Sequence, residues 1–306
     1  MHLAFNEDQA TFLTVLDQML ANEAESGFRT VEGWGRWDYG HALDTRLEEA
    51  GFFDAAGIDE LGPVAAVAMI GAVARVPVAV ECAASALLRP VLGSTVPRPL
   101  AVVVDDTPQT NAAIRYLPVA RTLVSIRPDG VRVADVAARP VESLFAYPMG
   151  VMSDPPTWRM TDADPATLRR LWQVALAAEL GGVLSGGLAS VLAYVRDREQ
   201  FGQPLGSFQG IQHRLAEDAV RIEAARWLVL RAAALGDAGD AALALGQLQG
   251  HATRIGYDLH QFMGAMGLTL EHPLHRWTYR ARALRGEMGG AARAMGNYAD
   301  ARWGAA

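Results

Sequence analysis

The sequence YVRDREQFGQPLGSFQGIQHRLAED, residues 194–218, decides the fold. It begins at the end of one predicted helix, crosses a Gly/Pro-rich elbow at residues 201–206, and enters a second helix. Arg198 and Gln200 precede the elbow, and Phe201 opens it. A guanidinium group, amides and an aromatic ring around exposed backbone are suited to a phosphate-bearing or flat ligand. The stretch therefore predicts a ligand-binding loop between two helices.

The residues on both sides of this loop predict a helical bundle. Asp164 can cap a helix that has Pro165 at its first position and runs to about residue 198. Further long helices are predicted over residues 207–235, 241–263 and 272–302, the last with a break at Gly289–Gly290. Four long helices joined by short turns form an up-down bundle. Glycines clustered inside the first helix predict that another backbone packs closely against it: Gly181, Gly182, Gly186 and Gly187.

The first half of the chain has a different pattern, which predicts short helices followed by short strands. Apolar spacing predicts helices over residues 6–24, 43–49, 60–76 and 80–88. Strands are predicted over residues 100–104, 114–117, 122–126 and 131–133, with a hairpin turn at 127–130. The expected fold is mostly α with a small β domain. It comprises an N-terminal helical region (1–96), a reduced central β domain (97–160) and a C-terminal four-helix bundle (161–306).

Composition excludes several classes of function. The 306 residues are 51% hydrophobic, which is typical of a globular protein, and the formal net charge is −7. An acidic excess argues against nucleic acid as a partner and provides no polybasic membrane patch. The single cysteine, Cys82, has no disulfide partner and is far from any metal-like cluster, so no metal site is expected. Without a signal peptide or a long uninterrupted apolar segment, the expected location is the cytoplasm.

The elbow and a second segment together resemble the acyl-CoA dehydrogenase family. The pattern RxQFG followed by PxGxFQxIQHxLAED is similar to that family's bundle signature. Residues 261–276, QFMGAMGLTLEHPLHR, resemble its QxxGGxGxTxExPLxR segment, at the spacing that the family has. The resemblance covers residues 164–285 most clearly and extends weakly over the first 90 residues.

This resemblance implies a role for both segments. In the family they bind FAD across a subunit interface, where an arginine and a phenylalanine meet the pyrophosphate and adenine end of a flavin held mainly by the neighbouring chain. The matching residues here are Arg198, Gln200, Phe201, Gln261, Gly264 and Ala265. Ala265 departs from the family, which has a second glycine there. The alternative interpretations are that Phe201 is a core residue and that Arg198 is a surface charge.

The catalytic base of the family is missing from its two usual positions. The reaction removes a proton α to a thioester and passes a hydride to the flavin, so it requires a carboxylate over the substrate. The family's spacing gives Met288 for the usual base and Trp172 for the less common one. Glu287 lies one residue from the usual place and is more readily interpreted as a solvated helix residue. No segment between residues 100 and 158 resembles the family's TEPGAGSD flavin contact.

The resemblance and these absences together predict the non-catalytic subunit of a heteromeric acyl-CoA dehydrogenase. Such enzymes pair two related chains as an α2β2 heterotetramer, share FAD across the interface, and resemble those that actinobacteria use on steroid-derived CoA thioesters. The partners implied are a second dehydrogenase-like subunit, an acyl-CoA and an electron-transfer acceptor. Two alternatives stay open: a self-sufficient homomeric dehydrogenase that uses Glu287, and a scaffold homologue without flavin.

Overall fold

Helix α6 (Pro165–Asp197) is the axis around which the other elements pack. A computed structural model describes residues 4–25, 39–104 and 113–304. Asp164 caps α6 as predicted, because its carboxylate accepts a hydrogen bond of 2.8 Å from the backbone N–H of Thr167. By length and composition α6 could cross a membrane, but 78% of its most apolar window is buried inside the protein. Its apolar character therefore belongs to a core helix.

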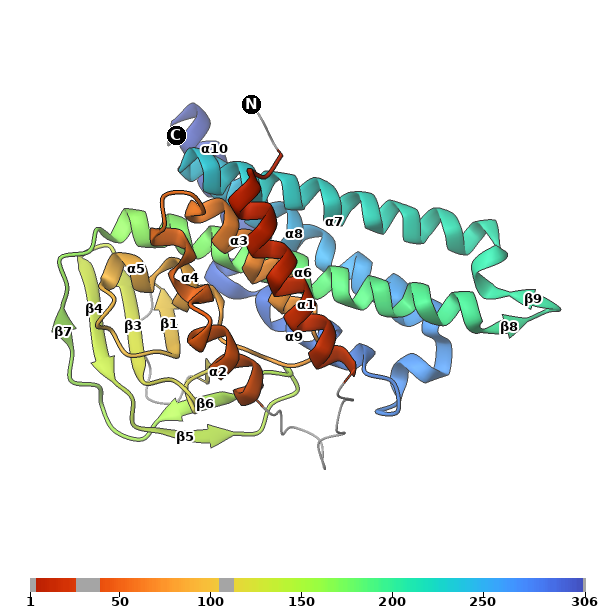
Figure 1. The fold of residues 1–306 in the computed structure, drawn as a ribbon, viewed down its shortest axis with the longest axis horizontal. Coiled ribbons are helices and arrows are strands. Elements are labelled where there is room, and N and C mark those ends of the chain that lie inside the picture. Colours follow the sequence, from red (N-terminus) through yellow and green to blue (C-terminus); the bar gives the residue numbers. More distant parts are fainter. Residues whose placement is uncertain (1–3, 26–38, 105–112, 305–306) are drawn as a thin grey trace.

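The C-terminal half forms the predicted bundle. Helices α7 (Gln209–Leu235), α8 (Ala238–Met263) and α9 (Leu274–Leu284) pack on α6, and α10 (Gly290–Trp303) packs on α8. Figure 1 shows these helices side by side, with the sheets at one end and the β8–β9 hairpin at the other. The fourth predicted helix is interrupted as expected, since the backbone turns at Met288 (φ 53°) and Gly289 (φ 87°) between α9 and α10.

Glycines on α6 allow α3 (Gly62–Ala74) to approach at backbone distance, as predicted. A Cβ atom placed on Gly182 would overlap the carbonyl of Gly71, and one on Gly186 would overlap the carbonyl of Arg75. Any side chain at either position would force the two helices apart. These two glycines therefore fix the separation between the N-terminal helices and the bundle.

Side chains of helix α9 also hydrogen-bond to the C-terminal end of α3. The buried Arg280 guanidinium donates hydrogen bonds to the carbonyl oxygens of Ala74 (3.2 Å) and Val76 (2.7 Å). The indole Nε1 of Trp277 donates to the carbonyl of Arg75 at 2.8 Å. Side chains of α9 thus satisfy carbonyl groups that the end of a helix leaves without intrahelical partners.

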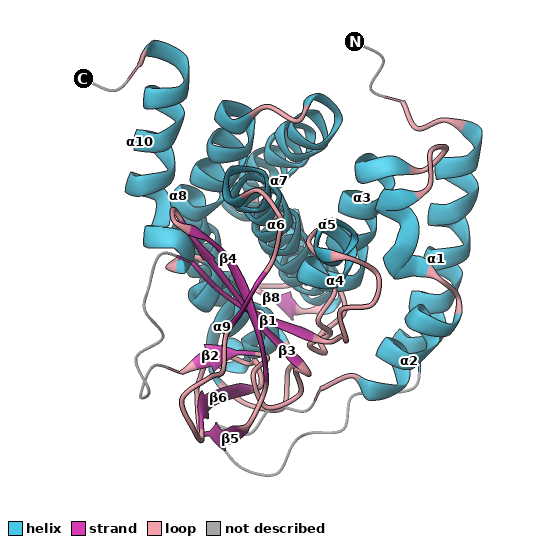
Figure 2. Cartoon of the chain, turned by 90° about the vertical axis from the view of Figure 1, so that its left-hand side faces the viewer, coloured by secondary structure: helices cyan, strands magenta, loops and turns pink. Residues whose placement is uncertain are grey.

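The N-terminal helices lie across one face of the molecule (Figures 1 and 2). They are α1 (Glu7–Glu25), α2 (His41–Glu49), α3, α4 (Ala83–Leu87) and α5 (Arg89–Leu92), with a 3-10 helix at Phe52–Gly57. The side chain of Asn6 caps α1, and Cys82 is buried. The sequence also predicts an irregular, aromatic-rich connection within residues 27–40 and a turn at 105–109. These segments fall largely or wholly outside the described residues.

The β region consists of two small sheets (Figure 2). The first has the order β1-β3-β4-β7, with β1 parallel to β3 and the other pairs antiparallel. The second has the order β2-β6-β5. The predicted 114–117 strand is limited to two residues, because the backbone of Tyr116 turns to a φ of 64°. The strands are β1 (Leu100–Val104), β2 (Ile114–Arg115), β3 (Thr122–Arg127), β4 (Gly130–Asp135), β5 (Ala138–Val141), β6 (Met149–Met152) and β7 (Arg159–Met160); the last three were not predicted.

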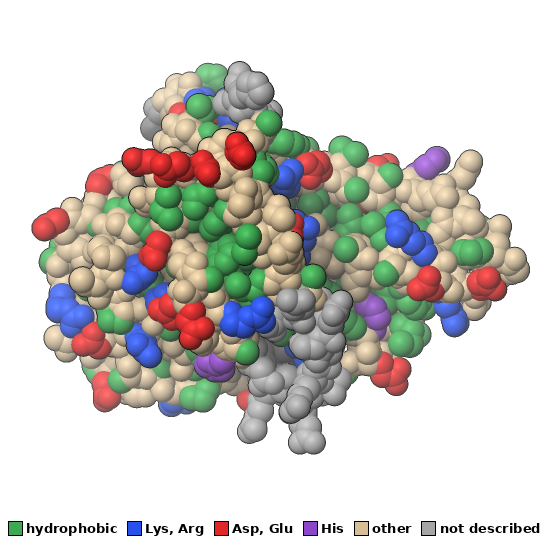
Figure 3. Space-filling model, in the orientation of Figure 1, with side chains coloured by type: hydrophobic (Ala, Val, Ile, Leu, Met, Phe, Trp, Pro, Cys, Tyr) green, Lys and Arg blue, Asp and Glu red, His purple; other side chains and the backbone are tan. Residues whose placement is uncertain are grey.

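A groove of about 510 Å³ lies between α1, α3, α6 and α7. Hydrophobic side chains gather over this face in Figure 3. The lining is mainly apolar but includes two carboxylates, Asp17 and Glu223, as well as Arg75 and Arg226. Arg226 is already paired with Glu223 at 2.8 Å.

Candidate functional site

The elbow after α6 folds as a tight β-hairpin. Strands β8 (Glu199–Gln200) and β9 (Gln203–Pro204) pair in antiparallel register, and Phe201 and Gly202 form the turn at φ values of 57° and 81°. Positive φ at both turn residues matches the twist of a two-residue hairpin. The N–H of Leu205 then bonds to the carbonyl of Arg198 at 2.8 Å, which closes the base of the hairpin.

This turn holds Phe201 at a positive φ with its ring exposed to solvent. Its side chain is 89% exposed, and its only ring neighbour among the described residues is Phe208, edge-on at 6.1 Å. A bulky residue at positive φ is strained, and exposure of a large aromatic ring stabilises nothing within the chain. The interpretation of Phe201 as a core residue is therefore wrong. Arg198 and Gln200 beside it are also exposed.

The second segment surrounds the end of α8. Gln261 lies exposed on the last turn of this helix, and Ala265 is exposed in the 3-10 helix Gly264–Leu268 that follows. Gly264 between them has φ 57° and ψ −139°, a backbone conformation that is essentially restricted to glycine. A Cβ atom on Gly264 would meet nothing within 4 Å, so its backbone is open to a ligand.

Both segments lie at the same end of the bundle, the right-hand end in Figure 1. The rings of Tyr194, four residues before Arg198, and His272, which follows the second segment, are 6.2 Å apart. The structure therefore brings the ends of α6 and α8 together, as a shared ligand site requires. We call this end of the bundle, with Arg198, Gln200, Phe201, Gln261, Gly264 and Ala265, the tip.

A buried ionic cluster lies between the sheets and the bundle. Arg115 of β2 donates two hydrogen bonds of 2.8 Å to the carboxylate of Glu179 on α6. The Tyr147 hydroxyl donates to the same carboxylate at 2.8 Å, and the Tyr116 hydroxyl is shared between the Val80 carbonyl (2.9 Å) and this carboxylate (3.3 Å). Burial and the negative charge of Glu179 raise the pKa of both phenols, so they remain protonated donors. Glu179 is thus fully hydrogen-bonded.

Glu287 joins this cluster from the kink between α9 and α10. Its carboxylate lies 3.3 Å from Nε of Arg115, and its side chain is 27% exposed. The amide of Gln249 donates to the carbonyl oxygens of Leu284 and Glu287, both at 3.0 Å, and so holds the kink in place. Burial raises the pKa of Glu287, and the Arg115 guanidinium opposes the rise. The expectation that Glu287 is a solvated helix residue is therefore wrong.

The two positions of the missing base converge on the same cluster. The Trp172 ring lies 5.8 Å from the Arg115 guanidinium, and its indole Nε1 is buried without a hydrogen-bond partner among the described residues. Met288 occupies the kink next to Glu287. Within the part of the chain that is described, no group of three His, Cys, Asp or Glu side chains could hold a metal ion.

Sequence reasoning missed Arg115, Glu179, Tyr116 and Tyr147. One signal was present, because Glu179 is the only charged residue between Arg170 and Arg196 in an otherwise apolar helix. A lone carboxylate in such a helix requires a buried partner. That the partner is Arg115 depends on how the sheet docks on α6, which no local pattern encodes.

Comparison with known proteins identifies the C-terminal domain. Residues 172–300 match the sequence model described as "Acyl-CoA dehydrogenase, C-terminal domain". The matched range contains both segments of the tip as well as Glu179 and Glu287. Residues 172–300 therefore match the C-terminal domain of the acyl-CoA dehydrogenase family.

Among curated proteins, the chain is similar to the acyl-CoA dehydrogenase FadE34 of Mycobacterium tuberculosis, with 36% identity over 127 residues. This match covers 39% of the chain and 18% of that relative, and the 3-sulfinopropanoyl-CoA desulfinase of Paraburkholderia xenovorans is covered over 29% of its length. The chain thus matches less than a third of either protein.

Solved structures agree over nearly the whole chain. A chain of the ChsE4–ChsE5 complex from Mycobacterium tuberculosis superposes with a TM-score of 0.78 at 21% identity, covering 96% of this chain and 97% of that one. The Tcur3481–Tcur3483 steroid acyl-CoA dehydrogenase variant gives a TM-score of 0.80 at 22% identity, covering 97% and 98%. The predicted fold, mostly α with a small β domain and a C-terminal bundle, is confirmed.

Proposed function

We propose that this chain is the non-catalytic subunit of a heteromeric, FAD-dependent acyl-CoA dehydrogenase. In this proposal the tip completes a flavin site that lies mainly on a second, related subunit, in an α2β2 assembly. The partner supplies the catalytic base and most of the cofactor contacts. The bound flavin would accept hydride from the thioester substrate.

The observation that carries the proposal is the state of Phe201. The ring is 89% exposed on a strained turn, so its position gains nothing from its own chain. Strain of this kind persists where a ligand or a partner uses the residue. A flat ring system brought by another subunit would bury the Phe201 ring and offset the strain.

The other tip residues fit the dinucleotide end of FAD. The exposed Arg198 guanidinium has no ion-pair partner among the described residues and can meet a phosphate oxygen. The Gln261 amide can donate a hydrogen bond, and the open backbone at Gly264 allows a phosphate to approach. These residues bind and orient; none of them can take the substrate proton.

The buried cluster supports a non-catalytic role. A base must have a free carboxylate over the substrate, whereas Glu287 is paired with Arg115. The positive charge beside it stabilises the ionised carboxylate and so lowers its affinity for a proton. Two of the solved chains that match over nearly their full length come from complexes that are each named for two components. That resemblance supports a heteromer for this chain.

For the substrate we propose an acyl-CoA, and within that class a bulky steroid-derived thioester. One matching structure is a steroid acyl-CoA dehydrogenase, which motivates the narrower choice. An electron-transfer acceptor would reoxidise the flavin on the catalytic subunit. The pathway would then be lipid or steroid degradation in the cytoplasm.

The test is to purify the chain alone and together with a related dehydrogenase chain that carries the catalytic glutamate. We expect flavin absorbance and acyl-CoA oxidation only in the complex. Tight FAD binding and dehydrogenation by the chain alone would overturn the proposal in favour of the homomeric enzyme. Absence of FAD from both samples would favour the scaffold.

Within the complex, Arg198→Ala tests the tip directly. Loss of one charge-assisted hydrogen bond to phosphate should weaken FAD binding roughly tenfold or more. Arg196→Ala, two residues earlier and also exposed, is the matched control and should retain FAD. Equal FAD occupancy in the two variants would remove Arg198 from the site.

One observation favours the homomeric alternative. Glu287 is partly buried at a kink, and its pKa is raised, which is the direction a general base requires. If Arg115 moved when substrate bound, Glu287 could accept the proton. The lone-chain assay above separates this candidate from the heteromer.

A further inference from the structure

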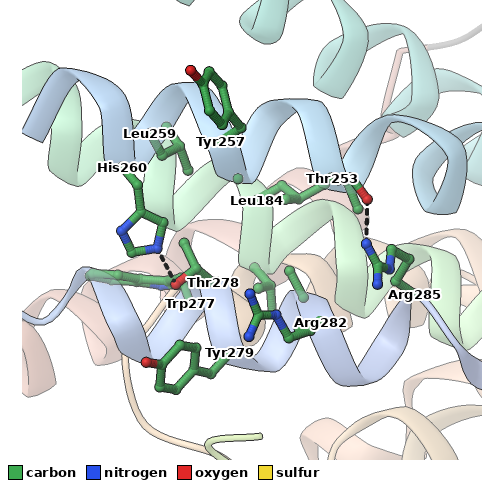
Figure 4. A pocket seen from close by; sticks show the side chains of 14 residues that line it. Leu184, Thr253, Tyr257, Leu259, His260, Trp277, Thr278, Tyr279, Arg282 and Arg285 are labelled. Carbon is green, nitrogen blue, oxygen red and sulfur yellow. Dashed lines mark hydrogen bonds between the residues drawn. The ribbon is translucent and has the colours of Figure 1, made fainter. Parts of the chain in front are cut away.

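A cleft of about 320 Å³ lies between α8 and α9, with α6 at its base. Figure 4 shows Arg282 near the centre of the opening, with Tyr257 above it and Tyr279 below. At one end, the His260 ring hydrogen-bonds to the Thr278 hydroxyl at 3.0 Å. This cleft lies outside the proposed flavin contacts and outside the buried cluster.

The charge of this cleft is one-sided. Arg282 and Arg285 line it, and no aspartate or glutamate does. Neither guanidinium has a carboxylate partner among the described residues; Arg285 donates to the Thr253 hydroxyl, and Arg282 lies 5.8 Å from the Tyr279 ring. In a chain of net charge −7, two arginines at one opening without a carboxylate partner in the described residues form a local site for an anion.

Two other cavities, both larger, lack this pattern. The groove between α1 and α7 contains Asp17 and Glu223, and the cavity beside the start of α6 contains Asp164. A carboxylate on the lining repels an anionic ligand and competes for the arginines. The α8–α9 cleft is the one of these three in which the arginines face no such competitor.

The base of the cleft is apolar and open. Leu184, Leu259 and Trp277 form it, with Gly256 on the α8 wall. A Cβ atom on Gly256 would meet nothing within 4 Å, so the missing side chain leaves real space. Binding sites for small molecules combine such an apolar surface with a few polar groups that fix orientation, at volumes of about 300 Å³ and above.

We propose that the α8–α9 cleft binds a small anion that carries a flat apolar group. The carboxylate or phosphate head lies against Arg282 and Arg285, and the Thr278 and Thr253 hydroxyl groups complete its hydrogen bonds. The apolar body lies over Leu184 and Trp277. Carboxylate and phosphate heads share this chemistry, and the choice of probes separates them.

The experiment is a calorimetric titration of the full chain with two charged probes and two controls. AMP presents a phosphate head on a flat ring, and 2-naphthoate presents a carboxylate head. Adenosine lacks the charge, and inorganic phosphate lacks the apolar body. We expect saturable 1:1 binding of AMP, of 2-naphthoate, or of both, and binding at least about tenfold weaker for each control. No binding of either charged probe at millimolar concentration overturns the proposal.

Two variants locate the site. Arg282→Gln removes the central charge and should weaken binding about tenfold, whereas Arg226→Gln on α7 should leave it unchanged. Gly256→Leu fills the cleft and should abolish binding. Because leucine favours helix over glycine, this variant should fold with an equal or higher Tm, so loss of binding would not reflect unfolding.

A last variant separates the cleft from the tip. Arg198→Ala should bind the probes as tightly as the wild type, because Arg198 lies outside the cleft lining. If Arg198→Ala loses the binding while Arg282→Gln retains it, the probes occupy the tip and the cleft proposal is wrong. None of these titrations requires FAD or a second subunit, so the result is independent of the proposed dehydrogenase function.

Discussion

Nη1 of Arg115 lies 2.8 Å from both carboxylate oxygens of Glu179, across 64 positions of sequence. The two side chains are 7% and 6% exposed, so this ion pair joins the small sheet to α6 inside the protein. Glu287 adds a second carboxylate to the same guanidinium. One arginine therefore pairs with two carboxylates beside Trp172 and Met288, the positions where the family places its base.

Arg115→Met should destabilise the fold strongly. Removing one partner of a buried ion pair leaves an uncompensated charge and costs about 3–5 kcal/mol. Urea unfolding followed by circular dichroism would measure the loss. Arg159→Met is the control, because its pair with Asp135 is exposed and should contribute little. Equal stability of the two variants would show that the buried cluster does not hold the sheet to the bundle.

Glu287→Gln decides which subunit does the chemistry. In the proposed heteromer, turnover of acyl-CoA by the complex should stay within about threefold of the wild type, because the proton moves to the partner's base. If this chain carried the base, turnover would fall by about 10²–10⁴-fold. Steady-state oxidation of one acyl-CoA by the variant and wild-type complexes distinguishes these results.

Phe201→Gly should separate stability from function. Glycine adopts φ 57° without the steric cost that phenylalanine bears, so the free energy of unfolding of the lone chain should rise by about 1 kcal/mol. The same change removes the aromatic ring from the tip and should lower FAD occupancy of the complex. Chemical denaturation and flavin absorbance measure the two effects. A destabilised lone chain would mean that the Phe201–Phe208 contact outweighs the strain.

The Asp164 cap makes the start of α6 sensitive to pH. Hydrogen bonds from Thr167, first from its hydroxyl and then from its N–H, lower the pKa of this carboxyl below 3.8. Its contribution to stability is therefore present above pH 3.8 and is lost as the pH falls through the lowered value. Asp164→Ala should lower the Tm at pH 7, and its deficit against the wild type should shrink at acidic pH.

Asp164→Asn supplies the control for this pH effect. The amide oxygen still accepts a hydrogen bond from the first turn but does not titrate. The Tm difference between Asp164→Asn and Asp164→Ala should thus stay constant over the same pH range. A deficit of Asp164→Ala that persists unchanged in acid would show that the carboxylate charge does not contribute to the cap.

The bundle was predictable because its signals are local. The Asp164–Pro165 start, the glycines that face α3 and the break before Gly290 each follow from a few adjacent residues. Strands β5, β6 and β7 were missed because they are short, and two of them contain an arginine or a proline that weakens the apolar alternation. Pairing with distant strands, rather than propensity, holds them in place.

In the candidate site too, some residues could be predicted from local sequence and others only from the fold. The tip residues come from two contiguous motifs, so the sequence could name them, but it could not show that Phe201 is strained and exposed. The cluster around Arg115 combines residues of β2, α6 and the α9–α10 kink. Their meeting depends on the docking of the sheet, and the surroundings of Glu287 could be established only from the fold.

The hydrogen bonds from α9 to the end of α3 also affect the order in which the chain can fold during synthesis. The carbonyl groups of Ala74 and Val76 are hydrogen-bonded by the guanidinium of Arg280, which lies 206 and 204 positions further along the chain. When only the N-terminal helices have left the ribosome, the side chains of α9 that hydrogen-bond to the end of α3 have not yet been synthesised. We expect the first 160 residues to stay incompletely folded until α9 emerges, and so to depend on the newly made C-terminus for their final packing.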